Sequence, residues 1–132
     1  MQIPRYFTSD HKTPYGALKF TERSSKITNA DGSVVSEIGK VVVPETWSQV
    51  AADIMAQKYF RKAGVPAKTR KRQENGVPEW LCPSEPDTAA MSHLPESERF
   101  IGETDGRQVF HRMAGCWTYW GWKEGVFSSE ED

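Results

Sequence analysis

Residues 103–123, "ETDGRQVFHRMAGCWTYWGWK", decide how this chain folds, because they combine a helical apolar pattern with a dense cluster of aromatic rings. Val109, Met113 and Trp117 recur every four residues, and side chains three to four residues apart share one face of a helix. The glycines oppose this pattern, because each lowers helix propensity by about 1 kcal/mol relative to alanine. The segment therefore predicts a helix over residues 103–123 that depends on packing for its stability.

The same segment holds three of the five tryptophans of the chain, and each large ring can bury roughly 150–250 Å². Together the rings form more apolar surface than a monomer normally exposes. We therefore expect the chain's own core, a partner domain or a stacked ligand to cover them. A core and domain-interface role is favoured over base or cofactor stacking, because the interspersed glycines let another backbone approach. The candidate docking or core residues are Trp117, Tyr119, Trp120, Trp122, Trp47 and Phe110.

Upstream of this segment the pattern changes from strands to a helix. Residues 17–43 are predicted to form short strands, with a tight hairpin turn at the Asp-Gly dipeptide of residues 31–32, because glycine tolerates a positive φ. Residues 46–63 are predicted to form a helix with an apolar stripe. Thr46 and Gln49 match the capping-box spacing, which satisfies the free amides at a helix start.

The middle and the end of the chain lack a regular pattern. Residues 64–102 contain five of the eight prolines and are predicted to be an irregular linker. Residues 128–132, "SSEED", place serines before acidic residues, which is typical of a helix N-terminus, and we interpret them as the start of a truncated helix. The expected fold class is α+β, with short strands in a hairpin and two amphipathic helices joined by a long irregular connection.

The net charge of −1 hides an asymmetry between the two halves of the chain. Residues 1–72 carry 13 Lys and Arg against six Asp and Glu, whereas residues 73–132 carry four against 12. A basic run of this kind fits a solvated helix end and loop, or a surface for phosphates or an acidic partner. One alternative function is therefore a free-standing module that binds single-stranded nucleic acid through its basic loop and tryptophans. The basic run comprises Lys58, Arg61, Lys62, Lys68, Arg70, Lys71 and Arg72.

The residues offer no catalytic or metal-binding motif. The candidate metal ligands are Cys82, His93, His111 and Cys116, and their spacing matches no standard zinc pattern, so no metal site is assigned. Nothing cationic adjoins Cys116 to activate its thiol. The chain has no apolar run of bilayer length and no signal-peptide pattern at its start, and its two cysteines are therefore expected to be free thiols. These features indicate a cytoplasmic protein.

Several long stretches together resemble one enzyme family. They are "RYFTS" and "TPYGALKF" in residues 5–20, "VPETWSQVAADIMAQKYFRKAGVP" at 43–66, "GVPEWL" at 76–81 and "ERFIGETDGRQVFHRMAGCWTYWGWKEGVFSSEED" at 98–132. Over nearly the whole chain, from about residue 5 to residue 132, they resemble the N-terminal region of adenosylcobalamin-dependent, class II ribonucleotide reductases.

The resemblance implies a parent enzyme that reduces ribonucleotides, in the ribonucleoside-diphosphate reductase class, to deoxyribonucleotides for DNA synthesis by a radical mechanism. In this family a ten-stranded α/β barrel carries the radical cysteine and a pair of reducing cysteines, downstream of the region that this chain matches. Neither Cys82 nor Cys116 stands in a matching motif, so no catalytic or cofactor-binding residue is assigned in this chain. We expect a structural docking region that is inactive alone and does not bind cobalamin tightly. Its expected partner is the catalytic barrel, on the same or a separate chain, through which it would meet ribonucleotide substrates. No membrane contact or direct nucleic-acid binding is expected.

Overall fold

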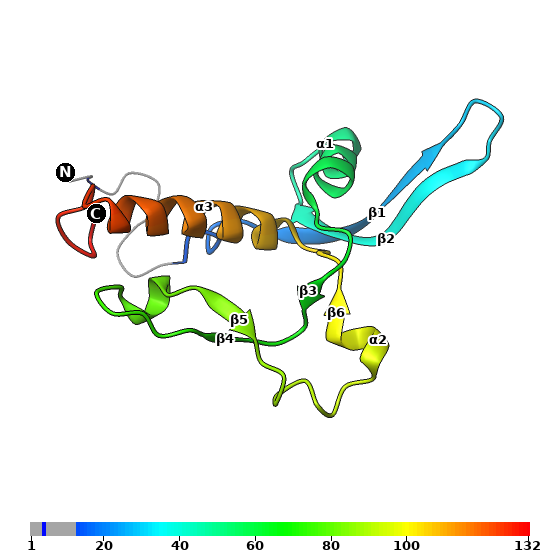
Figure 1. Cartoon of the computed structure of the whole chain (residues 1–132). Helices are drawn as coiled ribbons and strands as arrows, with labels where there is room; N and C mark the ends of the chain where they lie inside the picture. The colour runs from blue at the N-terminus through cyan, green and yellow to red at the C-terminus, as the bar shows by residue number, and fades with distance from the viewer. Residues whose placement is uncertain (1–3, 5–12) are drawn as a thin grey trace.

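Two small hydrophobic clusters and a long helix organise the computed structural model, which describes residue 4 and residues 13–132 (Figure 1). The described residues combine helices with two-stranded antiparallel sheets, so the mixed helix-and-strand class expected from the sequence is confirmed. Residues 5–9, which carry part of the family resemblance, lie outside the described residues. In chain order the elements are β1 (Phe20–Thr28), β2 (Val34–Pro44), α1 (Gln49–Ile54), the π-helical turn η1 (Met55–Tyr59), β3 (Val65–Pro66), β4 (Thr69–Lys71), the 3-10 turn η2 (Glu79–Leu81), β5 (Ser84–Pro86), α2 (Glu96–Arg99), β6 (Phe100–Ile101) and α3 (Gly106–Lys123).

The antiparallel hairpin of β1 and β2 projects from the rest of the molecule, and we call it the arm (Figure 1). In its turn, Gly32 has a φ of 83°, a conformation that favours glycine. The Asp31 carboxylate accepts hydrogen bonds from the backbone and the hydroxyl of Ser33, which closes the turn. The register shifts between Arg23 and Ser25, and a bulge of this kind bends and twists a hairpin.

The helix that follows the arm does not start where the sequence predicts. Ser48 rather than Thr46 caps α1, because the Ser48 hydroxyl accepts a hydrogen bond from the backbone N–H of Ala51 at 3.2 Å. The side chain of Gln49 donates instead to the carbonyl of Ser24 in β1, at 2.8 Å. The predicted capping box is therefore wrong, because Thr46 lies in the turn after β2, where the N–H of Trp47 donates to the carbonyl of Pro44 at 3.0 Å, and Gln49 is the first residue of α1.

This helix also ends earlier than residue 63. From Met55 the chain continues as the π-helical turn η1, in which the N–H of Phe60 donates to the carbonyl of Met55 at 3.1 Å. Phe60 itself is extended, with a ψ of 131°, and its ring is buried in the core. The helix therefore ends where the Phe60 side chain enters the core. Local helix propensity does not indicate this end, because it depends on a tertiary contact.

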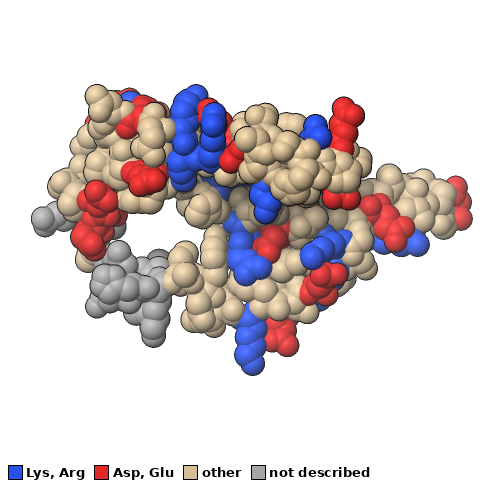
Figure 2. All heavy atoms as spheres, turned by 90° about the horizontal axis from the view of Figure 1, so that it is seen from below, with Lys and Arg blue, Asp and Glu red and all other residues tan. Residues whose placement is uncertain are grey.

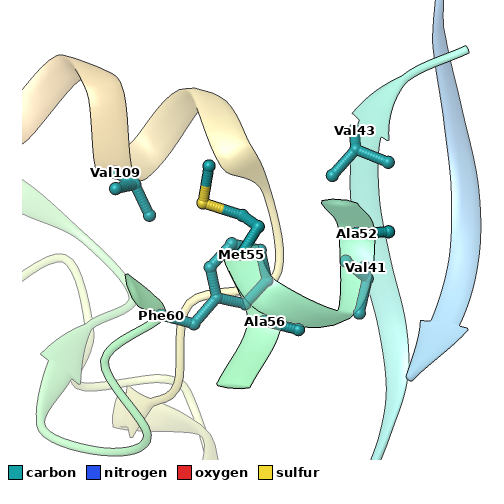
Figure 3. Close-up of a cluster of buried hydrophobic side chains, with 7 residues drawn as sticks. All are labelled: Val41, Val43, Ala52, Met55, Ala56, Phe60 and Val109. Carbon is teal, nitrogen blue, oxygen red and sulfur yellow. The ribbon is translucent and has the colours of Figure 1, made fainter. Parts of the chain in front are cut away.

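The first hydrophobic cluster joins the arm to α1, η1 and α3. It lies between β2, α1, η1 and the start of α3, so it links segments far apart in the sequence (Figure 3). Ile38, Trp47 and Met113 pack against it as half-buried side chains. Its buried members are Val41, Val43, Ala52, Met55, Ala56, Phe60 and Val109.

The segment between the helices is not the irregular linker that the sequence predicts over residues 64–102. It contains the antiparallel pairs β3–β6 and β4–β5, together with η2 and α2. Each strand in these pairs has only two or three residues, and Pro66 and Pro86 lie within them. Proline cannot donate to a ladder, which keeps such pairings short and below the length at which alternation can be recognised.

The helix α3 has 18 residues and is the longest in the described chain. Its first turns contact the first cluster, and its last turns contact a second cluster formed by Val77, Leu81 and Cys82. Among the residues that the structure describes, no helix has both the length and the apolarity needed to cross a membrane.

Gly102 lies against backbone, and this close approach gives a stability prediction. A Cβ atom at Gly102 would be 2.8 Å from the carbonyl oxygen of Lys62, whereas one at Gly39 would meet nothing within 4 Å. We expect Gly102→Ala to lower the free energy of unfolding by about 1–3 kcal/mol, the usual cost of overpacking. Urea denaturation of the variant measures this cost. The matched Gly39→Ala variant should stay close to the parent chain, and equal losses in both variants would contradict the prediction.

Candidate docking surface

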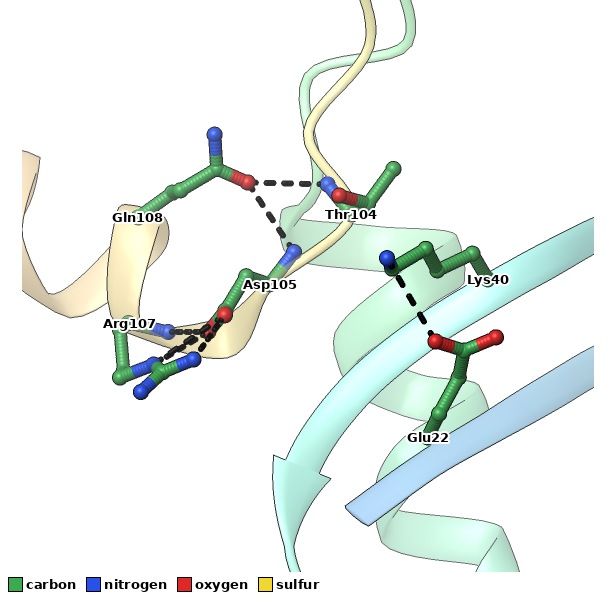
Figure 4. Close-up of polar contacts among 6 residues, drawn as sticks. All are labelled: Glu22, Lys40, Thr104, Asp105, Arg107 and Gln108. Carbon is green, nitrogen blue, oxygen red and sulfur yellow. Dashed lines mark hydrogen bonds and ion pairs between the residues drawn. The ribbon is translucent and has the colours of Figure 1, made fainter. Parts of the chain in front are cut away.

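The start of α3 is fixed by a capping box, whose residues are present in the sequence but were not recognised in the sequence analysis. Asp105 is the N-cap, and its carboxylate accepts a hydrogen bond from the N–H of Arg107 at 2.9 Å (Figure 4). The Gln108 side chain accepts in return from the N–H groups of Thr104 and Asp105 at 2.9 and 3.0 Å. The spacing of an acidic residue and a glutamine three positions later could have identified this capping box.

The Arg107 side chain ties this cap to the arm. Its guanidinium donates to both carboxylate oxygens of Asp105 and lies 4.3 Å from the centre of the Phe20 ring at the start of β1. Beside it, Lys40 of β2 pairs with Glu22 of β1 at 3.5 Å on the exposed face of the arm (Figure 4). Of these contacts, the cation–π contact between Arg107 and Phe20 is the one that joins the first turn of α3 to the arm.

A buried carboxylate connects α3 to the end of η1. Glu103 is only 6% exposed, and it accepts hydrogen bonds from Arg112 Nε at 2.8 Å and from the backbone N–H of Arg61 at 2.9 Å. Arg112 also donates to the carbonyl of Tyr59 at 2.6 Å. Burial raises the pKa of the Glu103 carboxyl, but these hydrogen bonds and the Arg112 charge outweigh it, so the pKa lies below its ordinary value.

One face of the C-terminal half of α3 is covered by the chain itself. Tyr119 and Trp122 pack against the second cluster, and the Trp122 indole N–H donates to the carbonyl of Gly76 at 2.7 Å. Glu74 accepts hydrogen bonds from the Tyr119 hydroxyl at 2.8 Å and from Lys123. These two rings are thus part of an internal contact between α3 and residues 74–82.

The opposite face of the same turns is uncovered within the described chain. Trp117 is 61% exposed and Trp120 is 58% exposed. Trp117 lies one helical turn after Met113, so it continues the row of side chains that packs on the first cluster at Val109 and Met113. The elements that cover this row do not extend to the last turns of α3 (Figure 1). We call the exposed rings of Trp117 and Trp120 the aromatic face.

The end of α3 explains why several glycines are present. Gly125 has a φ of 68°, its N–H donates to the carbonyl of Trp122, and the next N–H, of Val126, donates to the carbonyl of Gly121. This pair of bonds is a Schellman motif. It turns the chain so that the Phe127 ring lies over Gly121, where an added Cβ would be 2.6 Å from a ring atom.

Beyond this turn, residues 128–132 form a short turn rather than a helix, with the N–H of Ser129 donating to the Asp132 carboxylate at 3.0 Å. Glu130 accepts a hydrogen bond from the Trp80 indole N–H at 2.7 Å, which ties this segment to η2. The helix start expected at residues 128–132 stays a prediction.

The six predicted docking or core residues are thus divided by the structure. Trp47 packs on the first cluster and meets the half-exposed ring of Phe110 edge-on, with ring centres 6.3 Å apart. Tyr119 and Trp122 are occupied internally, which leaves the aromatic face as the candidate docking surface. The sequence analysis assigned all six residues to one docking or core set. Their positions along the helix do not show which face of α3 other parts of the chain cover.

The basic run does not form a uniform surface. On the face shown in Figure 2, Lys and Arg side chains are interspersed with Asp and Glu. Arg70 pairs with Glu85 at 2.7 Å, and the Lys71 ammonium donates to the carbonyl of Cys82 at 2.8 Å. Two of these charges therefore stabilise the β4–β5 region.

The described residues bring no three His, Cys, Asp or Glu side chains together in a metal-binding group. Cys82 is buried in the second cluster, where its thiol contacts the carbonyl of Val77 at 3.6 Å, while Cys116 is exposed on α3. Among the residues that the structure describes, we therefore assign no metal ligand.

Comparison with known proteins gives a consistent result. Residues 21–132 match the family model described as class II vitamin B12-dependent ribonucleotide reductase. The chain is 53% identical over 132 residues to a vitamin B12-dependent ribonucleotide reductase of Bradyrhizobium diazoefficiens and 52% identical to one of Agrobacterium fabrum, in each case covering 100% of this chain and 10% of the relative. A third, from Rhodopirellula baltica, is 26% identical over 128 residues, covering 97% of this chain and 9% of that protein. The chain therefore spans about a tenth of the length of these relatives and corresponds to their N-terminal part.

Proposed function

The chain belongs to the class II vitamin B12-dependent ribonucleotide reductase family, and from this premise we propose that it is a structural N-terminal portion whose aromatic face docks on the catalytic portion of such an enzyme. The catalytic portion is the part that follows this region in the relatives, and the family resemblance implies that it is an α/β barrel. Our proposal gives this chain a positioning role, with the chemistry performed elsewhere in the enzyme.

The observation that carries the proposal is the exposure of Trp117 and Trp120 at the end of a row whose earlier members pack on the first cluster, Val109 as a buried and Met113 as a half-buried side chain. With rings of roughly 250 Å² each, more than half exposed, the aromatic face presents on the order of 300 Å² of apolar surface. Covering it contributes on the order of 7 kcal/mol before entropic costs, at about 25 cal/mol per Å². A surface of this kind is typical of the buried anchors of an interface.

The activity proposed for the whole enzyme is the reduction of ribonucleotides, in the ribonucleoside-diphosphate reductase class, to deoxyribonucleotides. Adenosylcobalamin, when bound, supplies the radical chemistry of that reaction. In this proposal the residues of this chain do not enter it, because neither Cys82 nor Cys116 stands in a motif that matches the radical or reducing cysteines of the family. Both thiols are free, which supports a cytoplasmic location. No observation favours the alternative of a nucleic-acid-binding module.

Hydroxyl-radical footprinting of two proteins tests the docking proposal. The first is the 132-residue chain, and the second is a chimera in which this chain replaces the matched region of the Bradyrhizobium diazoefficiens relative. We expect Trp117 and Trp120 to be oxidised rapidly in the chain alone and slowly in the chimera, because the catalytic portion covers them there. Trp80, which is 53% exposed and lies outside the aromatic face, serves as an internal reference. Equal oxidation of both rings in the two proteins would refute docking through this face.

A further inference from the structure

The outer edge of β2 carries backbone groups that have no strand partner. In the described part of the chain β1 and β2 form a two-stranded sheet, and residues 34–40 of β2 make backbone hydrogen bonds only within the hairpin. The far half of the arm projects beyond the other elements in both Figure 1 and Figure 2, with no described segment beside it. An uncovered strand edge is a template for pairing with another extended chain.

Nearer the first cluster, the same edge is already in use. The N–H of Val42 donates to the carbonyl of Thr104 at 2.8 Å, and Val42 forms a parallel bridge with Asp105. The chain before this bridge does not continue along β2, because Ile101 pairs with Val65 in the β3–β6 sheet. The segment at Thr104 and Asp105 therefore pairs with the outer edge of β2 at Val42 alone, and the outer edge of residues 34–40 has no neighbouring strand in the described chain.

A cavity of about 230 Å³ lies where this cover stops. Its apolar lining comes from Ile38 of β2, Phe60 and Ile101, beside Gly102. The remaining lining residues are polar or charged, namely Glu37, Arg61, Lys62, Glu103 and Thr104. Ile101 is 44% exposed at its rim. The site thus combines an open backbone edge with room for an aliphatic side chain, which are the two features that strand addition needs.

We propose that an extended segment of the catalytic portion adds to the outer edge of β2 as a further strand and places an aliphatic side chain in this cavity. The inference rests on the proposed function and assigns a second contact to it, on a different element from the aromatic face. Main-chain hydrogen bonds to residues 34–40 supply the affinity, and the cavity supplies the selectivity. The arm gains the neighbour that a two-stranded hairpin needs for stability in water.

The occupant belongs to the catalytic portion and not to a second copy of this chain. In the relatives about nine tenths of the polypeptide lies outside the matched region, so a large surface is present to supply a strand. Edge-to-edge pairing of two arms would use about seven residues of each copy over about 23 Å. A stable interface uses roughly 20–30 residues a side, so paired arms alone fall short.

Hydrogen–deuterium exchange of residues 34–40 tests the inference, in the 132-residue chain and in the chimera. We expect these amides to exchange at least about tenfold more slowly in the chimera, because strand addition protects the outward-facing N–H groups. Ile101→Asp in the chimera should abolish this protection by placing a charge at the cavity. Phe100→Asp is the matched control, since Phe100 is the exposed neighbour in β6 that does not line the cavity, and it should retain the protection.

Two outcomes would overturn the inference. Unchanged exchange of residues 34–40 in the chimera would show that no strand is added, and protection that rises with concentration in the chain alone would identify a second copy as the occupant. Footprinting reports on α3, while exchange reports on β2. Shielded tryptophans with an unprotected arm would therefore reject strand addition and leave the proposed function standing, whereas exposed tryptophans would reject docking through the aromatic face.

Discussion

Replacing Glu103 with alanine is expected to lower the free energy of unfolding by about 3 kcal/mol, because it leaves a partly buried guanidinium without its carboxylate. The Arg112 side chain is 30% exposed and Glu103 only 3%, so water cannot fully replace the lost partner. The backbone N–H of Arg61 loses its acceptor in the same substitution. Urea denaturation of the 132-residue chain measures the loss.

The matched control for this prediction is Glu85→Ala. Glu85 also pairs with an arginine, Arg70, but that side chain is 64% exposed, so the pair is solvated and contributes about 1 kcal/mol or less. A loss at Glu103 no larger than the loss at Glu85 would show that the buried ion pair does not hold α3 against η1.

The same carboxylate gives the protein a predictable response to acid. The pKa of Glu103 is lowered in the folded chain, so its contribution to stability is fully present above the unfolded value of about 4.3. The contribution is lost as the pH falls through the lower, folded pKa, because protonation then removes the charge that binds Arg112. The parent chain should therefore lose stability below about pH 5 more steeply than Glu103→Gln, which has no carboxyl to protonate at this position.

The elements with local determinants correspond most closely to what the sequence predicts. The Asp-Gly dipeptide lies at the turn of the arm, and the row from Val109 to Trp117 lies in α3. The predicted cap of α1 was wrong because Thr46 lies in the turn after β2, so the helix begins three residues later, at Gln49. The Gln49 side chain donates to Ser24 of β1, 25 residues away, and no local pattern contains that contact. The pairs β3–β6 and β4–β5 escaped prediction because their strands are too short for alternation and join distant positions.

The candidate site was only partly predictable for a related reason. Periodicity identified the rings but could not show that residues 74–82 cover Tyr119 and Trp122 while leaving Trp117 and Trp120 open. That division depends on where η2 lies, and η2 is positioned by long-range contacts such as the bond from Trp80 to Glu130. The burial of Glu103 was equally invisible, because an acidic residue before a helix is usually exposed.

Replacing Trp117 and Trp120 together with serine in the chimera is expected to cost about 4 kcal/mol of docking free energy, at about 2 kcal/mol for each buried aromatic anchor. That loss corresponds to a docking equilibrium weakened by about a thousandfold. It should appear as a matching fall in docking-dependent protection of the α3 amides against hydrogen exchange. Ribonucleotide reduction should fall with it, because this chain no longer positions the catalytic portion.

The comparison with Trp80→Ser decides whether the effect belongs to the aromatic face. Trp80 is comparably exposed, at 53%, but it lies in η2, and its indole N–H is already bound to Glu130. The substitution removes the same type of ring from the surface without removing a side chain of the α3 row. Because the bond from Trp80 to Glu130 helps to position η2 against α3, some general loss of α3 protection is expected, but it should be clearly smaller than the loss in the double variant. If the single Trp80 variant and the double variant lost protection equally, general destabilisation would explain both results. If neither lost it, the two exposed indoles of α3 would have no role in holding the enzyme together.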